Sequence, residues 1–471
     1  MATARASMAS VTTPPPWPSP SPTPKPRGGR RVGGRARSGR GDGARMTVYE
    51  RGCAIDIDDA CFYRAESAQS RDLSVLCCAA TANDEGIDAY DATCASGARA
   101  VRWMRAGFVR SVVCNDVNAN VEAVLETNLS RAASEVEVEA ETPAYSTTFE
   151  DAQRELTRAW LDGQKFDIVD VDGFGSTNFA DAALRVVRYG GLFYACSTDG
   201  RALCGQNPSR LQVAFGNAVV APSRPAVNEI ALRTFIGDVV RRGAALKLDV
   251  VPVFSLFHAH GPVFRAMFRV VGPLRGAYGG FGGDNNIGFV GHCDACGNTS
   301  VVDEPLIRIF HHNKLEMAST VTCARCKGRD ADGRSAVLAL SGPLWIGPLH
   351  DADVVHRMRD EAERLGWLDD PTECKEKGQM SLEDLLDAFV GEALPALNGV
   401  AHYFRTDELA RKGRAARVPP RDVLTTALRA HGFAATRSHI DPRGLKTNAS
   451  VQEVVKCAND ALSALDAIDG R

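Results

Sequence analysis

The sequence predicts an α/β fold built around a parallel sheet, and three neighbouring segments carry this prediction. Residues 166–171 form a short apolar run with alternating acids, which is typical of a buried strand. Residues 179–187 carry apolar side chains at helical spacing, and we expect Tyr189-Gly190-Gly191 to end that helix. Residues 192–197 are a second apolar strand. The order strand, helix, strand is typical of a doubly wound fold.

The turn after the first of these strands is a candidate functional site. Asp172 ends the strand, and residues 173–176 (Gly-Phe-Gly-Ser) form a turn. This turn lies at the carboxyl end of a parallel strand, the edge at which open α/β sheets bind ligands. An acid and an aromatic residue bracketed by glycines at this edge make Asp172 and Phe174 candidate site residues.

Length and composition bound the organisation of the chain. The sequence has 471 residues and a hydrophobic content of 44%, which suggests two or three domains. No apolar run approaches the roughly 18 residues of a membrane span, so we expect no membrane association. Ten of the fourteen cysteines are scattered, several of them in apolar strands, and are interpreted as small core residues in a reducing compartment.

The first 45 residues differ in composition from the rest. They are rich in Pro, Ser, Ala and Gly, and they hold nine Arg or Lys residues against one acid, Asp42. Such a segment is typical of an organelle transit peptide, with the folded protein beginning near Met46. We therefore expect a plastid or mitochondrial location. The alternative is a basic, disordered tail that stays attached to a nuclear or cytoplasmic protein.

The charge of the remaining chain is unevenly distributed. Without the first 45 residues there are 46 basic and 57 acidic side chains, a formal charge of −11, which argues against indiscriminate nucleic-acid binding. Residues 401–450 run the other way, with ten Arg or Lys against four Asp or Glu. We expect a polyanion to bind there.

Residues 87–120 carry the first sign of a cofactor. A turn of small residues after a strand lets the backbone approach a ligand, and an acid about 20 residues further on accepts ribose hydroxyls. Asp116 lies 19 residues after Gly97. Because the full GxGxxG pattern is absent, a nucleoside cofactor such as S-adenosylmethionine is favoured over a dinucleotide; an ordinary turn with a helix-capping acid is the alternative. The expected elements are strands at Ile87–Ala92 and Ser111–Cys114, a turn at Cys94–Arg99 and a helix at Ala100–Ala106.

Two further polar positions have both a functional and a structural interpretation. Asp151 and Ala152 lie between an expected third strand and a helix, where an acid could bind an adenine amino group. Asp151 would serve equally well as a helix N-cap. His258 and His260 alternate along one face of an apolar segment, but two histidines are too few for a metal site, so we interpret both as structural.

Four cysteines form the most specific spacing pattern in the chain. They occur as two CxxC pairs, each followed by a glycine within two residues, with 26 residues between the pairs. Four thiolates in two such turns suit a tetrahedral, structural zinc ion. The alternative is two unrelated CxxC turns. The predicted ligands are Cys293, Cys296, Cys323 and Cys326.

Taken together, these segments resemble one family, the tRNA guanine-26 2-amino methyltransferases that form dimethylguanosine. Order and spacing match from about residue 55 to residue 450. The resemblance implies a Rossmann-like class I methyltransferase domain at residues 46–272 and an α+β domain with a zinc-binding insertion at 273–471. The matching positions are Phe62-Tyr63, Arg71–Ser74, Ser96–Arg99, Asn115-Asp116, Asp151-Ala152, Asp170–Ser176, Gly342–Asp351, Ser438-His439 and Lys446-Thr447.

The resemblance also implies a role for each matching residue. Asp172 would be the catalytic aspartate, accepting from the guanine 2-amino group, and Phe174 would stack on the target base. S-adenosylmethionine is the implied cofactor and tRNA the implied partner; we expect a monomer. The expected cofactor contacts are Arg71, near the methionine carboxylate, Gly97, Arg99, Asp116, Asp151 and Ala152. The expected RNA contacts are Phe62 and, from the positive charge of residues 401–450, Arg437 and Lys446.

Two departures from the family pattern bear on function. Gly173 stands where the family usually has proline, which loosens the turn. Residues 208–229 match the family poorly, which leaves the number of methyl groups added open. Two alternatives therefore remain: a methyltransferase acting on another nucleic acid or on protein, and a zinc-bearing RNA-binding protein with impaired catalysis.

Overall fold

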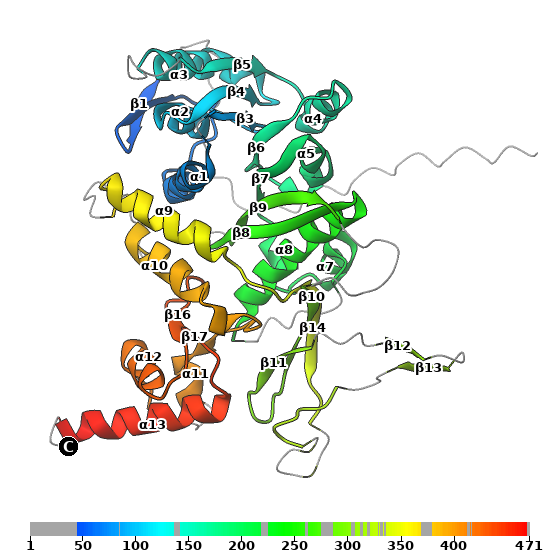
Figure 1. Ribbon diagram of the computed structural model, residues 1–471, viewed down its shortest axis with the longest axis vertical. Helices are drawn as coiled ribbons and strands as arrows, with labels where there is room; N and C mark the ends of the chain where they lie inside the picture. Colours follow the sequence, from blue (N-terminus) through cyan, green and yellow to red (C-terminus); the bar gives the residue numbers. More distant parts are fainter. Residues whose placement is uncertain are drawn as a thin grey trace, which may run out of the picture. The chain divides into compact units, whose positions relative to one another are not determined.

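A computed structural model describes residues 45–468 except for 84, 136–141, 218–224, 260–261, 275–285, 303–306, 311–313, 318–320, 328, 330–332, 334–335, 369–378, 412–414 and 416 (Figure 1). The predicted transit peptide therefore lies outside the described residues. An N-terminal hairpin of β1 (Met46–Glu50) and β2 (Cys53–Ile57) comes first, and no sequence pattern had predicted it.

A seven-stranded sheet forms the centre of the N-terminal half (Figure 1). The strand order is β5-β4-β3-β6-β7-β9-β8, in which β3 to β7 pair in parallel and β9 and β8 are antiparallel to their neighbours. The order reverses between β3 and β6, so this is the switch point at which such sheets bind ligands. The strands are β3 (Ile87–Asp91), β4 (Val109–Asn115), β5 (Ala144–Thr148), β6 (Phe166–Val171), β7 (Val187–Ser197), β8 (Leu248–His258) and β9 (Val263–Pro273).

Helices cover both faces of this sheet because the strand side chains alternate between two cores. Val169 and Val171 of β6 belong to one hydrophobic cluster, and Ile168 belongs to the other. The first cluster includes residues of α4 (Ala152–Leu161), α5 (Ala180–Val186) and α8 (Val227–Ala245). The second includes residues of α1 (Ala68–Thr81), α2 (Ala98–Arg105) and α3 (Glu122–Ser134). Two short helices, α6 (Gly200–Leu203) and α7 (Pro208–Phe215), precede α8.

The predicted strand at 166–171 is confirmed, but the predicted end of the following helix is wrong. Helix α5 ends at Val186 and strand β7 begins at Val187, so Tyr189-Gly190-Gly191 lies inside the strand. The pairing of β7 with β6 shifts register here. Gly190 has a φ of 84°, and a Cβ on Gly191 would stand 2.8 Å from the Asp167 carbonyl oxygen. The two glycines therefore allow an irregularity within strand β7 and do not end a helix.

The C-terminal half contains a three-stranded antiparallel sheet, a helical segment and a second small sheet. The elements are β10 (Ile287–His292), β11 (Thr299–Val302), β12 (Ile307–Phe310), β13 (Lys314–Met317), β14 (Ala339–Trp345), α9 (Ala352–Arg364), α10 (Leu382–Glu392), β15 (Phe404–Arg405), α11 (Thr406–Arg411), α12 (Arg421–Ala430), β16 (Ala435–Arg437), β17 (Gly444–Thr447) and α13 (Val451–Ile468). The sheet orders are β11-β10-β14 and β15-β17-β16.

Helices α9 and α10 share a core with the N-terminal half. Val355 of α9 and Phe389 of α10 belong to the same hydrophobic cluster as Leu73 of α1 and Phe254 of β8. Figure 1 shows α9 beside α1. The predicted boundary at residues 272–273 stays a prediction, and the shared core means that residues beyond it support the central sheet.

Candidate active site

Three carboxylates and two guanidinium groups meet at the switch point of the sheet. Asp91 ends β3, while Asp170 and Asp172 come from the end of β6. Arg99, in the first turn of α2, places its Nε 3.1 Å from Asp170 Oδ2 and an Nη 2.6 Å from Asp172 Oδ2. Arg265 of β9 donates from Nε to Asp172 Oδ1 at 3.2 Å. The predicted residues Asp172 and Arg99 are thus direct partners.

Arg265 is the cation of this group that sequence reasoning missed, and Asp91 was not a candidate site residue either. It lies on β9, next to β7 in the sheet, in register with Cys196. Its Nη2 also donates to Ser67 Oγ at 3.3 Å. The available signal was one arginine inside an otherwise apolar strand segment, Val263–Phe268, because a buried charge requires a partner.

The two arginines decide the protonation of Asp172. Burial alone would raise the pKa of Asp172, but the charges of Arg265 and Arg99 outweigh burial and hold the pKa at about 2. Burial raises the pKa of Asp91 to about 7, and burial also raises that of Asp170 well above its ordinary value. At neutral pH, Asp172 is therefore an ionised hydrogen-bond acceptor with 15% of its side chain exposed.

The turn after Asp172 presents aromatic side chains to solvent. Phe174 is 70% exposed and Phe62 is 59% exposed, and their ring centroids lie 5.2 Å apart in an edge-to-face contact. The structure thus brings together two predicted site residues that are more than a hundred positions apart. An exposed pair of this kind beside an ionised carboxylate offers a stacking surface for a planar ligand.

Gly173 does not depend on the conformational freedom of glycine. Its φ lies outside the left-handed region, whereas Gly175 has a φ of 69°. A Cβ on Gly173 would stand 3.2 Å from Thr93 Cγ2, a tight contact with the end of a side chain. A Cβ at this position, where the family pattern usually carries proline, therefore requires only a small adjustment of Thr93.

The turn after β3 has the features predicted for a cofactor-binding turn. Gly97 has a φ of 74°, and a Cβ there would stand 2.6 Å from Leu125 Cδ1, so a larger residue would be strained twice. Asp116, at the end of β4, accepts from the backbone N–H of Ala95 at 2.8 Å and of Asn118 at 2.9 Å. These bonds fix the carboxylate beside the turn.

Asp151 is a helix N-cap. Its side chain accepts from the backbone N–H of Arg154 at 3.2 Å, and α4 begins at Ala152. Ala152 is buried in the core. Asp151 therefore caps the helix, as the structural alternative predicted. A capping carboxylate still keeps a second oxygen for a ligand.

The four predicted zinc ligands form one cluster. The Sγ atoms of Cys293 and Cys326 lie 3.9 Å apart, those of Cys296 and Cys323 lie 3.6 Å apart, and all four lie within 4.8 Å of one another. Sulfurs each about 2.3 Å from a tetrahedral zinc ion stand about 3.8 Å apart. The cluster fits such an ion, and the strands beside it, β10 and β11, place the first pair.

Comparison with known proteins decides the family. The sequence pattern of the N2,N2-dimethylguanosine tRNA methyltransferases matches residues 42–459. The chain belongs to this family. Two similar proteins are a tRNA (guanine(26)-N(2))-dimethyltransferase of Saccharolobus solfataricus, 24% identical over 84% of this chain and 90% of that protein, and a mitochondrial one of Saccharomyces cerevisiae, 24% identical over 78% and 62%.

Comparison with a solved structure supports the predicted fold of this chain. Trm1 from Pyrococcus horikoshii, solved in complex with S-adenosyl-L-methionine, has a TM-score of 0.65 with 21% identity, covering 88% of this chain and 99% of that one. The predicted Rossmann-like methyltransferase fold is therefore confirmed. In the part of the chain that the structure describes, no helix has the length and apolarity to cross a membrane.

The structure gives the predicted contact Arg71 a partner within the fold. Its Nε lies 2.9 Å from Glu50 Oε2 in the N-terminal hairpin, and the pair is buried. Arg102 of α2 pairs with the same carboxylate and with Asp72. This network fastens α1 and α2 to the hairpin, and the predicted contact between Arg71 and a cofactor stays a prediction.

The predicted phosphate contact of Lys446 must be corrected. Lys446 is 3% exposed, and its Nζ lies 2.8 Å from Glu229 Oε1 and 3.0 Å from Glu392 Oε2. The positive charge count of residues 401–450 could not reveal these partners. Arg437 is half-buried and pairs with Asp384 at 2.5 Å, a contact on the surface that a phosphate could replace.

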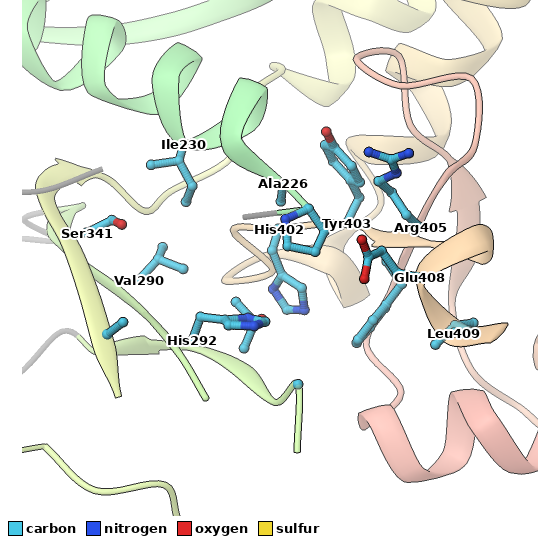
Figure 2. Close-up of a pocket in the computed structure, with 15 residues that line it drawn as sticks. Ala226, Ile230, Val290, His292, Ser341, His402, Tyr403, Arg405, Glu408 and Leu409 are labelled. Carbon is cyan, nitrogen blue, oxygen red and sulfur yellow. The ribbon is translucent and has the colours of Figure 1, made fainter. Parts of the chain in front are cut away.

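A small cavity marks where three regions of the chain meet (Figure 2). It has a volume of about 50 Å³. It is lined by Ala226 and Ile230 at the start of α8, by Val290 and Ser341 of the sheet β11-β10-β14, and by residues 402–405, 408 and 409. Figure 2 shows His402 between these regions. The cavity shares no lining residue with the Asp172 site, so we do not assign it to catalysis.

Proposed function

We propose that this chain transfers methyl groups from S-adenosylmethionine to the 2-amino group of guanosine 26 in tRNA, forming dimethylguanosine. Family membership supports the reaction class. The observation that carries the site assignment is the ionised Asp172, at the carboxyl end of β6 and beside the exposed ring of Phe174.

Asp172 is the proposed acceptor for the guanine 2-amino group. The lone pair of this amine is delocalised into the ring, which makes it a poor nucleophile. A carboxylate that accepts from its N–H favours a pyramidal nitrogen and stabilises the positive charge that develops. Arg99 and Arg265 hold Asp172 ionised and oriented, and a carboxylate has acceptor sites left for the substrate.

The remaining site residues bind and orient. The bound S-adenosylmethionine supplies the electrophilic methyl group and its leaving group. We assign the Gly97 turn and Asp116 to the nucleoside part of this cofactor, with Asp151-Ala152 at the adenine. Phe174 and Phe62 would hold the target base after it leaves the tRNA stack, which offsets part of the cost of unstacking.

The four cysteines are the proposed ligands of one structural zinc ion. Cys293 and Cys323 are buried in a small cluster with Ala336 and Leu338, which is a very small core without a metal. We expect one zinc per chain by metal analysis, and Cys323→Ser should unfold this region while leaving S-adenosylmethionine affinity intact. A zinc-free, fully folded protein would contradict the assignment.

An organelle location and a monomeric state remain part of the proposal. The yeast relative is named as mitochondrial, and the first 45 residues of this chain have transit-peptide composition. Fusion of residues 1–45 to a fluorescent protein tests the location, and light scattering of the purified chain tests the oligomeric state. Diffuse cytoplasmic fluorescence or a dimer mass would contradict these assignments.

Reaction of the purified chain with unmodified tRNA and S-adenosylmethionine tests the function directly. Nucleoside mass spectrometry should find dimethylguanosine, and replacing guanosine 26 by adenosine in the tRNA should abolish it. Monomethylguanosine alone would restrict the reaction to one transfer. Methylation at another position would contradict the proposed site.

A further inference from the structure

A second cavity lies on the far side of the catalytic carboxylate from the proposed cofactor turn. Its volume is about 120 Å³. One wall comes from the end of β8 and the start of β9, including Phe257 and Val263, and another from the C-terminal half, including Leu385 and Ile440. In the sheet order, Gly97 and Asp116 belong to the β3–β4 side of β6, whereas this cavity lies at β9 and β8.

The cavity is connected to the active site by Arg265. This residue lines the cavity and also donates to Asp172, and its Nη2 contacts Ser67, which lines the cavity as well. One guanidinium group thus contacts both the catalytic carboxylate and the space beyond it. A ligand in the cavity would lie next to the acceptor site without occupying it.

The lining combines apolar surface with positive charge. Arg64 at the rim and Arg265 are cations, and His258 and His439 add imidazoles, against one carboxylate, Glu66. His439 is buried and donates from Nδ1 to Glu392, while its Nε2 has no hydrogen-bond partner among the described residues. Because Arg265 is compensated by Asp172, Arg64 is the lining cation placed to meet a phosphate, and an apolar cavity with a cation at its rim suits a nucleotide, which offers a planar base and a phosphate.

We propose that this cavity receives the base of the nucleotide next to the target guanosine in the tRNA strand. The inference rests on the proposed function. A guanosine drawn out of the stack toward Asp172 and Phe174 leaves its neighbour without a stacking partner, and a second pocket beside the first can bind that base. The C-terminal half would then form part of the substrate site through Leu385, Ile440 and His439.

The test fills the cavity from its exposed rim. Ala259 is exposed and lines the cavity, so Ala259→Trp should obstruct it without disturbing the core. Ala144→Trp is the matched control at an exposed alanine in β5, on the opposite edge of the sheet. Arg64→Ala removes a rim cation, with Arg154→Ala, an exposed arginine of α4, as its control. Melting temperature and S-adenosylmethionine affinity should be unchanged in all four variants.

Substrates that lack one flanking base complete the experiment. Against ordinary tRNA, Ala259→Trp should lower kcat/KM roughly tenfold, the size of losing one stacked base, and Ala144→Trp should not. Wild type should lose a similar factor on tRNA that is abasic at position 25 or at position 27, whichever base the cavity holds. Ala259→Trp should lose nothing more on that substrate, because variant and substrate remove the same contact. Arg64→Ala should flatten the salt dependence of binding, and Arg154→Ala should not.

The outcomes separate this inference from the proposed function. The inference is overturned if the loss of kcat/KM from Ala259→Trp multiplies with the loss from each abasic substrate, or if Ala259→Trp keeps full activity. Neither result affects the proposed function, as long as the wild type methylates guanosine 26. An effect of Ala259→Trp that is equal on all substrates assigns the cavity to another ligand and also overturns it. Absence of any methylation of guanosine 26 by the wild type overturns both.

Discussion

Two groups in this chain pair buried carboxylates with buried cations, and they differ in how far their side chains are exposed to solvent. At the switch point, Asp172 is held by two arginines and keeps part of its side chain exposed beside an exposed aromatic pair. In the C-terminal half, Glu392 contacts Lys446, His439 and His350, and all four side chains are at most 4% exposed. Each group compensates its charges, but only the first holds a partly exposed carboxylate that can accept from a ligand.

The closed group fastens the two halves of the described chain. Glu229 and Arg233 of α8 form an ion pair, and Arg233 also donates to the carbonyl oxygens of Trp345, Gly347 and Val400. Lys446 links Glu229 to Glu392 of α10. The burial of Glu229, Glu392 and Lys446 therefore indicates a structural function for these charges. The difference between the groups predicts which variants affect stability and which affect catalysis.

The largest expected effect is on stability and comes from the closed group. Glu392→Ala leaves His439 buried without its carboxylate and leaves Lys446 with Glu229 alone, which should cost about 3–5 kcal/mol of unfolding free energy. Chemical denaturation measures this loss. Turnover per folded molecule should stay near that of the wild type, and a selective loss of turnover with normal stability would contradict the structural interpretation of this group.

Arg265→Met should have the next largest effect, and on catalysis. Without the charge of Arg265, the pKa of Asp172 rises from about 2 toward its ordinary value, because burial is no longer outweighed. Since the ionised form is the acceptor, activity falls as pH falls through this pKa. The acid limb of the single-turnover pH profile should therefore move to higher pH in the variant. An unchanged limb together with an unchanged rate would remove Arg265 from the site.

Phe174→Ala should have a smaller effect, confined to the substrate. Losing the stacking surface should cost about 1–3 kcal/mol in capture of the target base. The expected result is a weaker apparent affinity for tRNA with unchanged S-adenosylmethionine affinity by calorimetry. Phe62→Leu, which changes the other ring of the pair, serves as the comparison. Equal kcat/KM in Phe174→Ala and wild type would show that the base stacks elsewhere.

Gly173→Pro should have the smallest effect. The φ of Gly173 lies outside the left-handed region, and the nearest obstacle to a Cβ is the side chain of Thr93 at 3.2 Å. We therefore expect proline to be tolerated and to stabilise the chain by roughly 0.4–1 kcal/mol by restricting the unfolded state. Thermal unfolding and turnover of the variant test this, and a crippled but folded enzyme would mean that the turn differs from the family pattern.

The parts of the site that the sequence alone could predict are those specified by residues close together in the chain. The apolar run at 166–171, the turn after it and the two CxxC pairs are each specified by neighbouring residues, and the structure contains the strand, the turn and the cysteine cluster. The partner of Asp172 on β9 lies 93 positions away on an antiparallel strand, and no periodicity in either segment predicts that pairing.

Charge counting failed where the fold decides exposure. Lys446 and Glu229 are 217 positions apart, so a count over residues 401–450 treated a buried ion pair as a surface cation. Composition predicts how many charges a segment has, whereas pairing depends on tertiary contacts.

Asp172→Asn tests the central claim most directly. The amide can still accept a hydrogen bond, but it lacks the charge that stabilises the developing ammonium, so single-turnover methylation of unmodified tRNA should fall roughly 100- to 1000-fold. Affinities for S-adenosylmethionine and tRNA, measured separately, should stay within a small factor of the wild type. That combination would confirm Asp172 as the charged acceptor at the open end of the sheet. Near-wild-type turnover in Asp172→Asn would contradict the account.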